Sequence, residues 1–119
     1  MKKILISVAI MFVSGALHAQ SGYPNKPITL VVPYPVGGSN DVFARLIAKS
    51  LGEALKVAVV VDNRPGASGS TGTLQVSKAA PDGYTLLAVS SSMTTNAAIQ
   101  EKSGFDPTKN LTAIAMLAK

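Results

Sequence analysis

The chain has 119 residues, a formal net charge of +5, one histidine and no cysteine. This length allows one domain at most, and without cysteine no disulfide can stabilise it. The basic residues are scattered along the chain and no run combines them with aromatic residues, so nucleic acid is not an expected partner. The histidine, His18, lies close to the start of the chain, and a metal centre is therefore not expected either.

The first 19 residues have the three-part pattern of a secretory signal peptide, with a basic start, an apolar stretch and small residues before a cleavage site. The apolar stretch, residues 4–13, is shorter than the ~20 residues of a membrane-spanning helix, which disfavours the alternative of an uncleaved anchor. Cleavage is compatible with Ala16 or Ala19. We favour Ala19 because a loose polar segment follows it, and we expect an exported protein with residues 20–119 as its mature part.

Three short apolar runs alternate with two amphipathic segments in the mature part. The runs are rich in β-branched residues and bounded by turn residues, which is typical of strands buried in a parallel sheet. The expected strands span residues 28–32, 57–61 and 84–89. Apolar positions spaced by three and four residues predict helices over residues 40–55 and 71–80, the first capped by Ser39 or Asn40. A last apolar run, residues 111–118, fits a strand or a helix equally.

This alternation predicts an α/β fold with parallel strands joined by right-handed crossovers. Ligands of such sheets bind outside the carboxyl ends of the strands, where this chain has turns rich in glycine, serine and asparagine. These turns span residues 33–41, 63–71 and 90–96. We therefore expect the three turns to form one shared binding site.

Gly37, Gly38 and Ser39 are the strongest candidates for ligand contact. Glycine lets the backbone approach a ligand closely, and the first turn of a helix offers unpaired N–H groups that suit a carboxylate, directly or through ordered water. The alternative is a plain connecting turn. Asp41 suits the helix dipole, or would meet an ammonium or hydroxyl group of the ligand.

The other candidates come from all three turns. Tyr34, in the first turn, would stack on the ligand or hydrogen-bond to it, or else pack at the edge of the sheet. The second turn offers another nest of N–H groups or a solvated loop, and the third offers hydroxyl groups. Arg64 is expected to bracket loop carbonyls rather than the ligand. The full candidate set is Tyr34, Gly37, Gly38, Ser39, Asp41, Ser68, Gly69, Ser70, Ser90 and Ser91.

The mature sequence has no histidine and no cysteine, so the commonest catalytic base and the strongest nucleophile are missing. Residues 66–72 are rich in glycine and serine, but no Gly-Lys-Ser/Thr follows them to complete a phosphate-binding loop. We expect no enzymatic activity, no cofactor and no metal. A small exported enzyme or a nucleotide-binding domain is the disfavoured alternative.

Residues 31–41 (VVPYPVGGSND), 61–69 (VDNRPGASG) and 80–87 (APDGYTLL) occur in an order and spacing that resemble the motifs of the Bug family. The members of this family are periplasmic solute-binding receptors of tripartite tricarboxylate transporters. The resemblance implies a two-lobed, type II-like periplasmic binding protein that binds a small carboxylate between α/β lobes. It also implies that hinge closure is read by membrane permease subunits.

The chain departs from the family at Val36, where a second proline is frequent, and at Lys56, where glycine often ends the first helix. Family members are also considerably longer. The resemblance therefore implies that residues 20–119 form an incomplete first lobe and that the second lobe is absent. We expect weak or no ligand binding by this chain alone, and a truncated gene product without a function of its own is the alternative.

Overall fold

The computed structural model describes residues 22–93, 95 and 106–117. The expected signal peptide and both cleavage points lie outside these ranges, so they remain predictions. No helix among the described residues has the length and apolar character that crossing a bilayer requires.

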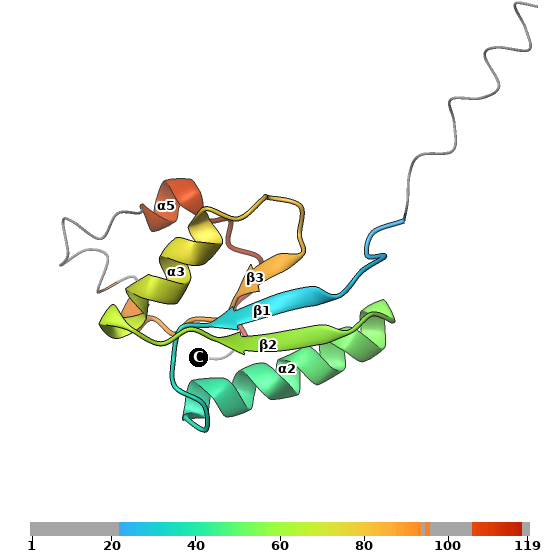
Figure 1. Cartoon of the computed structure of the whole chain (residues 1–119), viewed down its shortest axis with the longest axis horizontal. Coiled ribbons are helices and arrows are strands. Elements are labelled where there is room, and N and C mark those ends of the chain that lie inside the picture. The colour runs from blue at the N-terminus through green and yellow to red at the C-terminus, as the bar shows by residue number, and fades with distance from the viewer. Residues whose placement is uncertain (1–21, 94, 96–105, 118–119) are drawn as a thin grey trace, which may run out of the picture.

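The core of the fold is a three-stranded parallel sheet (Figure 1). Its strands are β1 (Ile28–Val32), β2 (Val59–Asn63) and β3 (Thr85–Leu87), in the order β2-β1-β3. The predicted α/β class and parallel strands are thus confirmed. β1 has its expected bounds, whereas β2 begins two residues later than expected because the turn that follows the preceding helix runs through residues 56–58.

Helices cover both faces of the sheet. Helix α2 (Ser39–Leu55) lies on one side, and η1 (Ala67–Gly69) with α3 (Ser70–Ser77) lies on the other (Figure 1). A short helix, α5 (Pro107–Asn110), was not expected from the sequence. Residues 111–117 form neither a strand nor a helix, which answers the question that their periodicity left open.

The apolar core joins α2 to the sheet through small side chains. Ala44 and Ala48 of α2 are buried against Leu30 and Val32 of β1. Partly buried neighbours complete the cluster: Tyr34, Val59, Val61, Leu86 and Ala88. Because the alanine side chain is small, the backbone of α2 lies close to β1. This packing positions the N-terminus of α2 at the edge of the sheet.

Both ends of α2 differ from expectation. The N-cap is Gly38, in an extended conformation and without a side-chain cap, so the predicted cap at Ser39 or Asn40 is wrong and Ser39 is the first helical residue. At the other end Lys56 has φ +57°, the left-handed conformation that usually selects glycine. The left-handed end of the helix therefore forms even though lysine replaces glycine.

Gly72 allows α3 to lie directly on the end of β1. A Cβ atom at this position would lie 2.9 Å from Cβ of Pro33 and 3.0 Å from the carbonyl oxygen of Arg64. The contacted atoms belong to a rigid proline ring and to the backbone, so they have little freedom to move aside.

We therefore predict that Gly72→Ala lowers the free energy of unfolding by ~1–3 kcal/mol, the usual cost of overpacking. Urea denaturation measures the change. Gln75→Ala, at an exposed position of the same helix, is the control and should stay within ~0.5 kcal/mol of wild type. Equal stability of the two variants would show that α3 is not packed this tightly.

Candidate functional site

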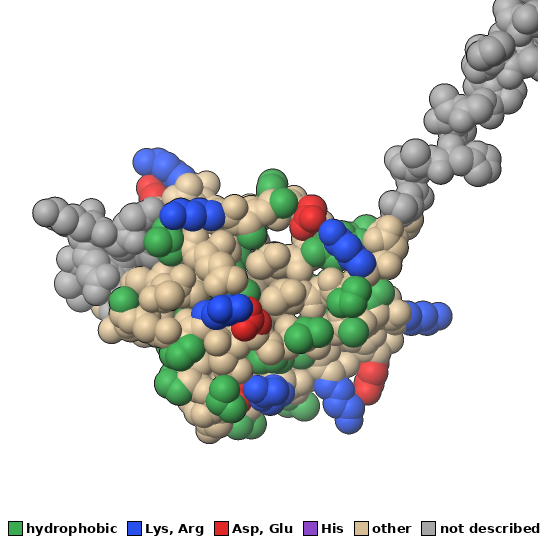
Figure 2. All heavy atoms as spheres, in the orientation of Figure 1, with side chains coloured by type: hydrophobic (Ala, Val, Ile, Leu, Met, Phe, Trp, Pro, Cys, Tyr) green, Lys and Arg blue, Asp and Glu red, His purple; other side chains and the backbone are tan. Residues whose placement is uncertain are grey.

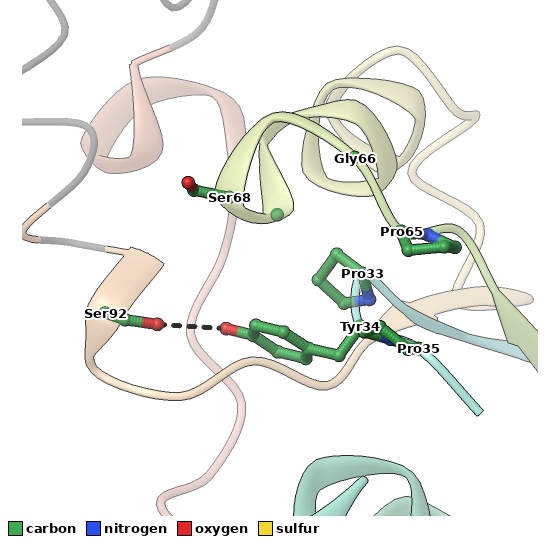
Figure 3. A pocket seen from close by; sticks show the side chains of 8 residues that line it. Pro33, Tyr34, Pro35, Pro65, Gly66, Ser68 and Ser92 are labelled. Carbon is green, nitrogen blue, oxygen red and sulfur yellow. Dashed lines mark hydrogen bonds between the residues drawn. The ribbon is translucent and has the colours of Figure 1, made fainter. Parts of the chain in front are cut away.

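The three turns that were expected to form a shared site meet at the carboxyl edge of the sheet. They follow β1, β2 and β3 and are called the first, second and third loops. Between them lies an open pocket of about 340 Å³ (Figure 3). Its lining residues are Pro33, Tyr34, Pro35, Pro65, Gly66, Ser68, Gly69 and Ser92. The first, second and third loops all contribute, so the pocket is shared by segments that are far apart in the sequence.

A ring of three hydroxyl groups ties the first loop to the third. The Tyr34 hydroxyl lies 2.9 Å from Oγ of Ser90 and 3.2 Å from Oγ of Ser92, and the two serine oxygens are 2.7 Å apart. The amide of Ser90 also donates to the Tyr34 oxygen at 3.3 Å. Figure 3 shows the Ser92 side chain pointing at the tyrosine hydroxyl.

This ring has a chemical consequence for any ligand. Each hydroxyl carries one proton, and either oxygen of each pair can be the donor. When all three protons are donated within the ring, lone pairs rather than protons face outward. Partial burial raises the pKa of Tyr34, but the hydrogen bonds from Ser90 and Ser92 outweigh it, and the pKa lies below its ordinary value of 10. The intact ring is therefore a poor partner for a bare carboxylate.

The first loop is held by a buried carboxylate. Asp41 is only 2% exposed, and its Oδ2 accepts hydrogen bonds from the Gly37 amide at 2.9 Å and from Nε of Arg45 at 3.0 Å. Its Oδ1 accepts one from Nδ2 of Asn63 at 2.9 Å. Asn63 also donates to the Tyr34 carbonyl oxygen and accepts from Arg45, so the end of β2, α2 and the first loop form one network.

The same contacts set the protonation of Asp41. The hydrogen bond from Arg45, followed by those from Gly37 and Asn63, lowers its pKa from 3.8 to about 2. All three donors favour the charged form. Because both carboxylate oxygens are occupied inside the protein, we interpret Asp41 as a residue that shapes the loop rather than one that touches a ligand.

The two helix N-termini differ in what they offer a ligand. In α2 the first intrahelical bond runs from the Val42 amide to the Gly38 carbonyl, so the amides of Ser39 and Asn40 have no acceptor within the helix. At α3, in contrast, the Gly69 amide donates to Gly66 and the Ser70 amide to Ala67. These two amides of the expected second nest are already used by the loop itself.

The structure brings some of the candidates together and separates others. Tyr34, Ser68 and Gly69 line the pocket, and Ser90 touches it through the tyrosine hydroxyl. The candidates that do not line it are Gly37, Gly38, Ser39, Asp41, Ser70 and Ser91. Ser70 follows the 3₁₀ turn into α3, whereas Gly37–Ser39 are exposed at the N-terminus of α2.

Ser92 is one of the serines whose hydroxyl groups the third turn was expected to offer, but nothing in the sequence ranked it above Ser90 and Ser91. Sequence reasoning missed Asn63, because its hydrogen-bond partners lie in other elements. Arg64 pairs with the Asp62 carboxylate at 2.9 Å rather than with the loop carbonyls expected of it. No group of three or more potential metal ligands occurs within the described ranges.

A sequence model described as the tripartite tricarboxylate transporter family receptor matches residues 43–119. The chain belongs to this receptor family. BugT of Bordetella pertussis is 44% identical over 95 residues, which cover 77% of this chain and 29% of BugT. This chain thus spans less than a third of the length of that relative.

Solved structures of similar proteins share the fold. One described as a periplasmic transporter matches with a TM-score of 0.68 and 41% identity, over 72% of this chain and 29% of that one. An R. palustris protein with adipate matches at 0.54 and 44% identity, over 56% and 22% of the two chains. MatC of Rhodopseudomonas palustris, with bound malate, matches at 0.53 and 38% identity, over 55% and 22%. The family consists of solute-binding receptors rather than enzymes.

The lowered pKa of Asp41 predicts a pH dependence of stability. The folded state stabilises the charged carboxylate of Asp41 more than the unfolded chain does. The contribution of Asp41 to the free energy of unfolding is therefore complete above about pH 4 and is lost as the pH falls towards 2. Asp41→Asn should therefore be less stable than wild type at pH 5, with the difference shrinking as the pH is lowered. Urea denaturation at a series of pH values measures this, with the exposed Glu53→Gln on the same helix as the control. A difference that does not change with pH would contradict the network.

Proposed function

We propose that this chain forms one wall of the binding site of a periplasmic solute receptor that takes a small carboxylate. The observation that carries the proposal is the meeting of three loops at the carboxyl edge of the sheet, beside a helix whose first amides are open. Membership of the receptor family supports it, as do the neighbours described with adipate and with malate.

We assign the carboxylate of the ligand to the N-terminus of α2. The amides of Ser39 and Asn40 are unpaired within the helix, lie at the positive end of its dipole and are reached directly or through ordered water. The hydroxyl groups of the pocket already hydrogen-bond to one another, and the amides of Gly69 and Ser70 at the start of α3 already donate to loop carbonyls. Of these three groups, the N-terminus of α2 therefore offers a carboxylate the best donors.

The pocket suits the rest of the ligand. The rings of Pro33, Pro65 and Tyr34 present apolar surface to a short carbon chain. The lone pairs of the hydroxyl ring would accept a hydrogen bond from a ligand hydroxyl or ammonium group. The ligand class we propose is thus a small organic acid whose carbon chain lies against the proline and tyrosine rings.

In a complete receptor, a second lobe would cover this wall, close by hinge motion and present the closed form to membrane permease subunits. We further propose that the chain is exported by its N-terminal signal peptide and acts in the periplasm. The described wall is open on one side, so contacts and shielding from water are both incomplete. Affinity of this chain alone is expected to be ~1 mM or weaker.

Nuclear magnetic resonance titration of the ¹⁵N-labelled chain with malate and adipate tests the assignment. We expect the largest shifts at the amides of Ser39 and Asn40. Ser39→Pro removes one of these N–H groups at the first helical position, where proline is tolerated, and should reduce the response, whereas Ser39→Ala keeps the N–H and should bind like wild type.

Neutral 1,6-hexanediol is the ligand control and should leave the α2 amides unchanged. Shifts that survive Ser39→Pro but disappear in Ser39→Ala would move the contact from the amide to the hydroxyl. No response of the three loops to either acid at tens of millimolar would overturn the proposed function.

A further inference from the structure

Two segments that enter the sheet side by side are bound to each other by aromatic and polar contacts. One segment precedes β1 and the other precedes β3, and both lie at the amino end of the sheet, opposite the candidate site (Figure 1). Together these contacts form what we call the N-terminal clasp. Its residues are Tyr23, Asn25 and Lys26 of the first segment and Asp82, Gly83 and Tyr84 of the second.

Two tyrosine rings form the aromatic part of the clasp. The rings of Tyr23 and Tyr84 meet edge to face, with their centroids 5.0 Å apart. The Lys26 ammonium lies 4.2 Å from the centroid of the Tyr84 ring. Both kinds of contact stabilise beyond the area that they bury. Basic and acidic side chains lie beside hydrophobic ones here (Figure 2), but the ion pair of Lys26 with Asp82 is exposed and adds little.

The two tyrosine hydroxyls join the segments by hydrogen bonds. The Tyr23 hydroxyl donates to the Gly83 carbonyl oxygen at 2.8 Å. The Tyr84 hydroxyl donates to Oδ1 of Asn25 at 2.9 Å and accepts the Asn25 amide at 3.0 Å. A Cβ atom at Gly83, which has φ +81°, would lie 2.8 Å from the Tyr23 hydroxyl oxygen. Glycine therefore allows the Tyr23 ring to lie against the turn before β3.

Strand β3 is the shortest strand of the sheet and the least buried. Its three residues are all half-buried, whereas four of the five residues of β1 are buried. Among the described residues it pairs with β1 alone. The Tyr84 carbonyl accepts the Thr29 amide at one end of this pairing, and the Ala88 amide donates to the Val31 carbonyl at the other. A short edge strand with few buried side chains opens at a low cost in free energy.

The same strand connects the clasp to the candidate site. Tyr84 belongs to the clasp, and β3 leads from it to Ser90, whose hydroxyl group forms the ring with Tyr34 and Ser92. The segment is thus held by the clasp at its amino end and by the Tyr34 hydroxyl at its carboxyl end. Without the clasp, the second contact and the short pairing with β1 have to hold the third loop.

We propose that Tyr23 and Tyr84 are positioning residues of the candidate site. They hold the start of β3 against the segment before β1 and thereby keep the third loop at the pocket. The clasp lies at the opposite end of the sheet, so neither tyrosine touches a ligand bound at the loops. The inference rests on the three-loop site of the proposed function, but it concerns how the third loop is held and is independent of which ligand binds there.

Amide hydrogen exchange of the ligand-free chain, followed by nuclear magnetic resonance, tests the clasp. The Ala88 amide reports on the end of β3, because it donates to the Val31 carbonyl at 2.9 Å. The Ser90 amide reports on the third loop, because it donates to the Tyr34 hydroxyl oxygen. Both amides lie far along the chain from the substituted side chain of Tyr23.

Tyr23→Ala removes a ring and a hydrogen bond, and it should speed exchange of the Ala88 and Ser90 amides about tenfold. Tyr23→Phe keeps the ring and should give a smaller rise. Tyr84→Phe deletes a single oxygen atom and both hydrogen bonds with Asn25, and it should also speed both amides. This mild variant tests the proposal even if Tyr23→Ala does not fold.

Val59→Ala controls for a general loss of stability. Val59 is half-buried in β2, which lies on the other side of β1 from β3. This variant should lower the free energy of unfolding but leave exchange at Ala88 and Ser90 within about twofold of wild type, because β3 opens while β2 stays in place.

Equal acceleration of the two reporter amides by Val59→Ala and by Tyr23→Ala would overturn the proposal, since β3 would then open only with the whole fold. Wild-type exchange at Ala88 and Ser90 in folded Tyr23→Ala or Tyr84→Phe would overturn it as well. The experiment contains no ligand, so a failure of the proposed function would leave its result unchanged. A failure of the clasp would likewise leave the test of the α2 amides intact.

Discussion

The buried carboxylate of Asp41 is the interaction on which the candidate site depends. It lies in the first turn of α2, and it binds the loop before the helix, the arginine one turn later and the last residue of β2. It accepts the Gly37 amide in a turn whose residues 35–39 are exposed, and so ties this turn to α2 and to the end of β2. The charge therefore adds a buried anchor to a turn that otherwise has little side-chain packing.

Two kinds of hydrogen-bonding group flank the first loop. The N-terminus of α2 presents backbone donors at one end of it, and the hydroxyl groups of Tyr34, Ser90 and Ser92 lie beside the proline rings of the pocket at the other. Donors suit the carboxylate of an organic acid, and the apolar surface suits its carbon chain. The first loop contributes to both regions, so holding it in place arranges the two relative to each other.

Much of the fold could be predicted because local pattern determines it. The strand at 28–32 and the helix after it follow from β-branched runs and helical spacing, and parallel connections follow from their alternation. The site was less accessible, because its key contacts join distant segments. No residue near Asn63 in the sequence indicates that its side-chain amide hydrogen-bonds to Asp41. The carbonyls of Gly66 and Ala67 accept the amides at the start of α3 because Ala67 and Ser68 are left-handed, and neither residue type usually predicts such a turn.

Amide hydrogen exchange at Gly37 tests the central claim most directly. Gly37 is exposed and lies outside any helix or strand, so its amide would exchange freely unless the Asp41 carboxylate accepts it. The account predicts measurable protection at neutral pH in wild type and its loss in Asp41→Ala, while the amides in the middle of α2 stay protected. An unprotected Gly37 amide in the folded wild-type chain would show that the carboxylate does not hold the loop.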